Sequence, residues 1–313
     1  ECDPSTGNDS DAVKVAALVT QSILQSNLKD LIGSRCRDAG AEVTWINVTE
    51  STKLYKETFN EYQNIITWNC RMPHAWIRSK KRNVLFLDNS LIHQRYGVSA
   101  DSDGYFSKSH FCEARLFNTE TEFDFSQIAK GIGFTPFTGG RPDGPILVAM
   151  QCRVDCNVNM EFPLAAKHKD KMEAFLNILH DHLPRRKKVL IRAHPRDQVI
   201  TGKWRKEWRL EKSNKLSEIL PKCSALVTVN STCASEAVFL GVPVAVFGTG
   251  VFTGSKVVID CSKEPRSVGK ILSFKQDINN CKRYCAALMN HATLPYAGDR
   301  TCSEFDRWLS RLT

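Results

Sequence analysis

The most informative segment joins an apolar strand to an apolar helix through a short polar run. Residues 225–229 are apolar except for Thr228 and predict a buried strand, and Asn230, Ser231 and Thr232 follow directly before the helix. Ser and Thr are preferred at helix starts, where free backbone N–H groups and the positive end of the helix dipole bind phosphate. Glu236, about one turn into the helix, is placed to accept hydrogen bonds from a ribose. Plain helix capping is the alternative interpretation of the same residues.

A second strand end carries cationic and imidazole side chains. The predicted strand 188–192 ends in Arg192, and His194 and Arg196 follow it. These groups offer hydrogen-bond donors for a pyrophosphate or for the charge that develops on a phosphate leaving group. Since ligands of parallel sheets bind at the carboxyl ends of the strands, both strand ends belong to one rim. Gln151, which ends an earlier strand, falls at the same rim, either as a substrate contact or as a polar residue at a strand edge.

In the first half of the chain, the carboxylate of Asp88 follows the predicted strand 83–87. Transfer of a group to a hydroxyl needs a base that takes the hydroxyl proton, and Asp88 is the candidate for this role. Capping a helix is its alternative role. The long segment that follows contains Asp101, Asp103 and Tyr105, which we assign to the acceptor side because long loops in compact domains are often functional. Either of these two aspartates is an alternative base.

The elements that position these residues follow an alternating pattern of short apolar runs and amphipathic stretches, which is typical of parallel sheets with crossover helices. The predicted strands are 13–19, 42–47, 64–68, 83–87, 146–150, 188–192, 225–229, 242–247 and 256–259. The predicted helices are 23–38, 167–182, 216–220 and 234–240, and residues 88–112 are predicted to form a loop. We therefore expect an α/β protein with two Rossmann-like domains that face a cleft.

The chain of 313 residues exceeds the size of most single cores, about 250–300 residues, so two domains are expected. Gly and Pro concentrate in residues 131–144, which predicts a linker there. The predicted order is a disordered leader (1–12), an N-terminal acceptor-side domain (13–130), the linker, a C-terminal domain with the phosphate-binding residues (145–295), and a C-terminal helix (296–313).

The composition is that of a basic globular protein. The formal charge is +9 at pH 7, which favours a polyanionic partner: nucleic acid, an acidic glycan or an anionic membrane surface. Solvated helix faces are the alternative explanation of each basic cluster. No apolar run reaches the roughly 18 residues that a membrane-spanning helix needs, so no transmembrane segment is predicted. The sequence leaves the oligomeric state open.

The chain has 12 cysteines, and their spacing lacks the paired motifs with nearby histidines that bind zinc. We expect no metal site and no cofactor apart from a co-substrate. Several cysteines lie in apolar segments, where a thiol behaves as a small hydrophobic group. Reduced cysteines in a cytoplasmic protein are the favoured interpretation, and a secretory protein with a few disulfides is the alternative.

Four segments together resemble the capsule-polysaccharide glycosyltransferases, notably the Kdo transferases of bacterial capsule assembly. They are the strand that ends at Asp88, residues 98–106, residues 192–197, and residues 229–243 with Asn230, Ser231, Thr232 and Glu236. The resemblance implies a GT-B fold, a nucleotide-sugar donor held by the second domain, an inverting mechanism and no required metal. It also implies that His194, Ser231, Thr232 and Glu236 hold the donor. The chain departs from the family where an acidic pair is usual, since Asn89 follows Asp88.

The expected function is therefore transfer of a sugar from a nucleotide-sugar donor to an acidic glycan or glycolipid. Transfer to hydroxymethylated bases in DNA, as viral enzymes of this fold perform, is one alternative, because the positive charge suits the DNA backbone. A UDP-sugar 2-epimerase and a non-catalytic binding module are others. The expected location is cytoplasmic, whether in a bacterium or in the host of a virus, or peripheral to the inner membrane.

Overall fold

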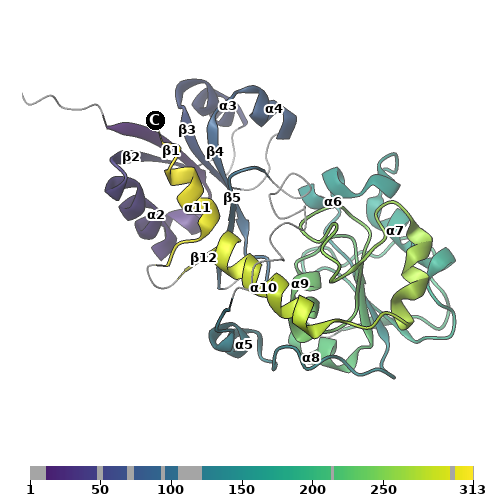
Figure 1. Ribbon diagram of the computed structural model, residues 1–313. Helices are drawn as coiled ribbons and strands as arrows, with labels where there is room; N and C mark the ends of the chain where they lie inside the picture. The colour runs from purple at the N-terminus through teal and green to yellow at the C-terminus, as the bar shows by residue number, and fades with distance from the viewer. Residues whose placement is uncertain are drawn as a thin grey trace, which may run out of the picture.

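The computed structural model describes residues 12–47, 52–68, 74–92, 96–104, 122–212, 215–296 and 300–312. Within them the chain forms two lobes, each built around one sheet with helices on its faces (Figure 1). The purple and blue elements of the first half make one lobe, and most of the teal and green elements make the other. The predicted leader lies outside the described residues except for Ala12.

The sheet of the first lobe has the strand order β12-β5-β4-β3-β1-β2. Its parallel strands are β1 (Val13–Val19), β2 (Ala41–Asn47), β3 (Asn64–Trp68) and β4 (Asn83–Asn89). Strand β5 (Gly97–Asp101) pairs antiparallel with β4, and β12 (Thr293–Pro295) pairs antiparallel with β5. The parallel strands end toward the second lobe, so their carboxyl ends are available for a site there (Figure 1).

Helices cover both faces of this sheet. They are α1 (Gln21–Leu24), α2 (Asn27–Asp38), α3 (Thr52–Glu61), α4 (His74–Ser79) and α11 (Ser303–Leu309). Ile32 of α2 and Trp308 of α11 pack against one face, which includes Val15. Tyr55 and Phe59 of α3 pack against the other, which includes Leu18. Strand β1 is thus buried on both faces, as its continuous apolar run predicts.

The sheet of the second lobe is parallel throughout, in the order β11-β10-β9-β6-β7-β8. The strands are β6 (Ile146–Ala149), β7 (Val189–Arg192), β8 (Arg209–Glu211), β9 (Ala225–Thr228), β10 (Val244–Val246) and β11 (Ile259–Asp260). The helices are α6 (Cys156–Glu161), α7 (Lys171–His182), α8 (Leu216–Ile219), α9 (Cys233–Leu240) and α10 (Ile278–Ala292), with 3₁₀ turns at Pro163–Ala165, Leu220–Lys222 and Pro265–Leu272.

The predicted linker 131–144 is packed onto the second lobe. It follows α5 (Ser126–Ile132), and the backbone N–H of Phe137 donates to the carbonyl of Phe239 in α9 at 2.9 Å. The rings of Phe125 and Phe137 also stack edge-on against Phe239, each with centroids 5.3 Å apart. The segment is therefore a docked connection.

The chain returns to the first lobe at its C-terminal end, where α10 crosses over and α11 packs beside β4 and β5 (Figure 1). Strand β12 pairs with β5, and the indole N–H of Trp308 donates to the carbonyl of Asn83 at 3.3 Å. The domain boundary predicted at residue 295 therefore differs from the structure, because residues 293–295 already belong to the first sheet.

Most predicted strands agree with the structure within about two residues, which is the usual uncertainty of element ends. The loop predicted over 88–112 is wrong for residues 97–101, which form β5. The strand predicted over 256–259 is displaced, since β11 occupies Ile259–Asp260.

Candidate active site

The helix start after β9 is built as the sequence predicts. The hydroxyl of Ser231 accepts a hydrogen bond from the backbone N–H of Cys233 at 3.3 Å. Thr232 is the N-cap residue of α9, and its side chain makes no capping hydrogen bond. The positive end of this helix dipole therefore lies at the carboxyl edge of the sheet, beside the polar residues 230–232.

Gln151 and Asn230 lie at this edge and contact each other. The amide Nε2 of Gln151 donates to Asn230 Oδ1 at 3.1 Å, and its Oε1 accepts from the Asn230 backbone N–H at 2.8 Å. Asn230 also donates through Nδ2 to the carbonyl of Thr249 at 3.1 Å. Both side chains are buried. The pair thus ties the ends of β6 and β9 together, and a donor contact by either residue stays a prediction.

Glu236 and Arg192 come from α9 and β7, and their charges interact. Burial raises the pKa of the half-buried Glu236 carboxyl to about 7, while the charge of Arg192 opposes this rise. The same guanidinium acts on the Cys233 thiol, whose pKa is raised by burial. Glu236 is therefore partly protonated near neutral pH, and it can both accept and donate hydrogen bonds.

His194 lies in the turn that follows β7. Its Nδ1 accepts a hydrogen bond from the backbone N–H of Arg196 at 3.2 Å, which leaves the proton of the neutral ring on Nε2. Burial, followed by the charge of Arg196, holds its pKa below the ordinary value, and Asp155 works in the opposite direction. At neutral pH the ring is thus a neutral Nε2–H donor at the same edge as Arg192.

Asp88 is the next-to-last residue of β4 in the first lobe. Its Oδ1 accepts from the backbone N–H of Asn89 at 2.7 Å. Burial raises the pKa of its carboxyl to about 7, although part of the side chain reaches solvent, and the charge of Asp155 raises this pKa further. Because Asp155 influences both Asp88 and His194, the two lobes bring these three groups into one electrostatic neighbourhood.

Asp155 was not among the residues predicted for the site. It is the N-cap of α6, and its carboxylate accepts from the backbone N–H of Asn157 at 2.9 Å. The available signal was an aspartate shortly after the strand end at Gln151, in an N-cap position. Its approach to Asp88 comes from the packing of the lobes and has no local signature in the sequence.

The two aspartates assigned to the acceptor side make contacts within the first lobe. Asp101 is buried, and its Oδ1 accepts from the backbone N–H groups of Asp103 and Gly104 at 2.7 and 2.9 Å. Asp103 lies 3.9 Å from Arg78 and 3.8 Å from Arg307. Asp101 thus fixes the turn after β5, and Asp103 links this turn to α4 and α11. Tyr105 lies outside the described residues, so its predicted role is not tested.

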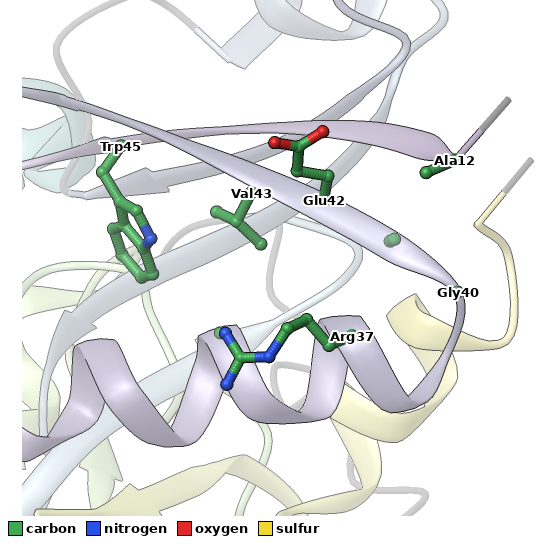
Figure 2. A pocket seen from close by; sticks show the side chains of 8 residues that line it. Ala12, Arg37, Gly40, Glu42, Val43 and Trp45 are labelled. Atoms are coloured by element: carbon green, nitrogen blue, oxygen red, sulfur yellow. The ribbon is translucent and has the colours of Figure 1, made fainter.

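The described surface includes a cavity beside the rim of the second lobe and a groove on the first lobe. A cavity of about 300 Å³, within the ordinary range for ligand sites, lies at the ends of β7 and β8 and is lined by Arg192, Ala193, Pro195, Gln198, Ile200, Leu210, Glu211 and Lys212. The groove, a hollow of about 640 Å³, lies between α2 and β2. Arg37, Val43 and Trp45 point into it, while the Glu42 side chain lies on the opposite face of the strand (Figure 2). This groove contains none of the predicted site residues.

The described part of the chain contains no cluster of His, Cys, Asp and Glu that would hold a metal ion. Its cysteines with described side chains are free thiols: Cys36, Cys152, Cys223, Cys233, Cys261, Cys281, Cys285 and Cys302. None of the helices in the ranges given above is long and apolar enough to cross a membrane.

Comparison with known proteins agrees with this architecture. A family model described as capsule polysaccharide biosynthesis protein matches residues 140–296, half of the chain. Thermosulfurimonas dismutans KpsC, described as a beta Kdo 2,7 transferase, has a similar structure with a TM-score of 0.54 at 15% identity, over 87% of this chain and 90% of that one. KpsC described as a beta Kdo 2,4 transferase gives a TM-score of 0.51 at 11% identity, over 88% and 90%. No curated protein matches the chain significantly in sequence. The predicted resemblance and the two-domain GT-B fold are thus confirmed.

Proposed function

The chain belongs to the capsule polysaccharide biosynthesis proteins, and we propose that this glycosyltransferase moves a sugar from a nucleotide-sugar donor to an acidic glycan or glycolipid. One observation carries the proposal. The charge of Asp155 acts to raise the pKa of both Asp88 in the first lobe and His194 in the second, so a candidate base and a candidate phosphate-binding group share one electrostatic neighbourhood.

The second lobe is suited to hold the donor. Arg192 and the Nε2–H of neutral His194 offer donors to the phosphate next to the sugar, and the start of α9 adds the positive end of its dipole. Glu236, inside the first turn of α9, is placed for the ribose hydroxyls. As the bond from the sugar to phosphate breaks, these groups stabilise the charge on the leaving phosphate.

The first lobe supplies the base. The carboxylate of Asp88 takes the proton from the acceptor hydroxyl while the hydroxyl oxygen forms a bond to the anomeric carbon of the sugar. The donor phosphate departs from the opposite side with the electron pair. This geometry inverts the anomeric centre. A pKa of about 7 leaves a substantial ionised fraction near neutral pH together with useful basicity. As the resemblance implies, the step requires no metal ion.

The acceptor class rests on the family and on charge. A capsule polysaccharide is a glycan, and the net charge of +9 favours an acidic one. The two similar structures are described as Kdo transferases, which supports an acidic sugar among the donors to be tested. A cytoplasmic or membrane-peripheral location belongs to the same proposal.

The test is a screen of nucleotide release. CMP-, UDP- and GDP-sugars, including an activated Kdo, are incubated with the protein in EDTA, alone, with an acidic capsule oligosaccharide, or with DNA that contains hydroxymethylated bases. Release stimulated by the oligosaccharide supports the proposal. Stimulation by DNA alone would identify DNA as the acceptor in place of a glycan. An isomerised donor without transfer would indicate an epimerase. No reaction with any donor would contradict the enzyme assignment.

A further inference from the structure

Arg153, in the loop after β6, contacts two carboxylates at the edge of the second sheet. Its Nε and Nη2 donate to the two carboxylate oxygens of Asp197 at 3.0 and 2.7 Å, and its backbone N–H donates to the same carboxylate at 2.9 Å. Such a bidentate pair fixes the direction as well as the distance between its partners. The Asp197 side chain is only 11% exposed. The loop after β6 and the turn after β7 are thus joined by three hydrogen bonds.

The same guanidinium also forms an ion pair with a second carboxylate. Arg153 Nη1 lies 3.5 Å from Asp170, the N-cap of α7. Asp170 in turn accepts from the backbone N–H groups of Met172 and Glu173, each at 3.0 Å, and from the hydroxyl of Thr201 at 2.9 Å. Arg153 is therefore anchored to the start of a helix, and the turn that it holds is fixed relative to that helix.

The turn held by Arg153 is the one that carries His194. The backbone N–H of Asp197 donates to the His194 carbonyl at 2.9 Å, and the two residues form an antiparallel bridge. Closing the turn also brings the backbone N–H of Arg196 to 3.2 Å from His194 Nδ1. The loop after β6, which contains Arg153, also carries Asp155 two residues later. Arg153 thus connects the turn that carries His194 to the loop that carries Asp155.

We propose that Arg153 is a positioning residue that holds the His194 turn and the Asp155 loop in the arrangement needed to bind the departing phosphate of the donor. This inference rests on the proposed function for the reaction that it serves. The planar fork of arginine is required, because the ammonium of lysine is a point charge and cannot make two parallel hydrogen bonds to Asp197. Arg153→Lys therefore keeps the charge and removes the orientation.

The test compares Arg153→Lys and Arg153→Ala with Arg141→Ala. Arg141 makes the same bidentate contact with Asp143, at 2.8 and 3.0 Å, on an exposed surface that is part of neither hollow nor of the site. Thermal unfolding establishes that each variant is folded. NMR titration of the imidazoles gives the pKa of His194, whose signal is identified by its loss in His194→Ala. This pKa reports on the conformation of the turn and does not depend on enzyme activity. The groups whose charges act on this ring are Arg192, Arg196, Asp155 and Asp197.

In Arg153→Lys we expect the pKa of His194 to rise toward its ordinary value, since the opened turn exposes the ring to water. We also expect kcat for donor release to fall by about tenfold or more, the scale of a lost positioned donor, with a smaller change in KM. Adding Arg153→Lys to His194→Ala should lower kcat no further, since one acts through the other. Arg141→Ala should change none of these values.

An unchanged His194 titration in a folded Arg153→Lys, or a full additional loss of kcat in the double variant, would overturn the positioning role. If the wild-type chain releases nucleotide from no donor, the proposed function fails by itself. The titration then still decides whether Arg153 sets the His194 turn.

Discussion

Replacement of Gln151 by alanine separates a structural role at the sheet edge from a donor contact. Gln151 is 4% exposed and satisfies two groups of Asn230, the backbone N–H at 2.8 Å and Oδ1 at 3.1 Å. Alanine leaves both groups buried without this partner, and each unsatisfied group costs about 1–3 kcal/mol. The expected loss is therefore about 2–6 kcal/mol, a large part of the roughly 5–15 kcal/mol that stabilises a typical domain.

The assay is urea unfolding of the wild type, Gln151→Ala and Gln63→Ala, followed by tryptophan fluorescence. Gln63 is exposed and hydrogen-bonds to Arg82 at 2.6 Å, so its loss should change stability by less than about 0.5 kcal/mol. Nucleotide affinity is measured on the folded fraction of each variant. A stability loss below about 1 kcal/mol, the value of one ordinary hydrogen bond, together with a clear loss of affinity, would refute the structural role and favour a direct donor contact.

Three further predictions follow from the same contacts. Asp88→Asn should lower transfer by about 100-fold or more. In the wild type kcat/KM should rise with pH through about 7, because the base acts when it is ionised. A pH–rate profile that is flat from pH 5 to 9 would exclude Asp88 as the base. The folded-state pKa of Glu236 is raised from 4.5 to about 7, so the folded protein binds an extra proton and its stability falls as pH rises across that window. Glu236→Gln should therefore be more stable than the wild type at pH 8 and equal to it at pH 4. Equal melting temperatures of the two proteins at both pH values would contradict the pKa shift. A methyl group on Gly97 would lie 2.1 Å from the Leu294 carbonyl oxygen, so Gly97→Ala should destabilise the β5–β12 pairing by about 1–3 kcal/mol in thermal unfolding, whereas Gly269→Ala, with open space around it, should not.

Local patterns in the sequence were sufficient for most of the parallel strands, although not for β8, and for the polar residues that follow the strands at the rim of the second lobe. Strands such as β1 and β9 are short apolar runs that end in polar or Gly-rich segments, and each ends where the composition changes. The rim residues Arg192, His194 and Glu236 follow from these strand ends, because the carboxyl ends of a parallel sheet share one edge.

Contacts between distant segments could not be predicted in this way. Strand β5 has small residues and no strong apolar alternation, and it becomes a strand because β4 and β12 pair with it. Strand β12 is three residues long, and its partner Ser99 lies far away in the sequence. The approach of Asp155 to Asp88 likewise depends on how the lobes pack. Periodicity carries information about neighbours along the chain and none about such pairs.

The most direct test of the central claim measures the anomeric configuration of the product and the dependence of its formation on Asp88 and His194. The wild type, Asp88→Asn and His194→Ala are incubated with the active donor and an acidic oligosaccharide, and the new anomeric centre is identified by NMR. The account predicts an inverted linkage from the wild type, transfer slowed by about 100-fold or more in Asp88→Asn despite retained nucleotide binding, and weakened nucleotide binding by His194→Ala. A retained configuration, or transfer by Asp88→Asn at the wild-type rate, would contradict a site in which Asp88 is the base that faces a donor held by the second lobe.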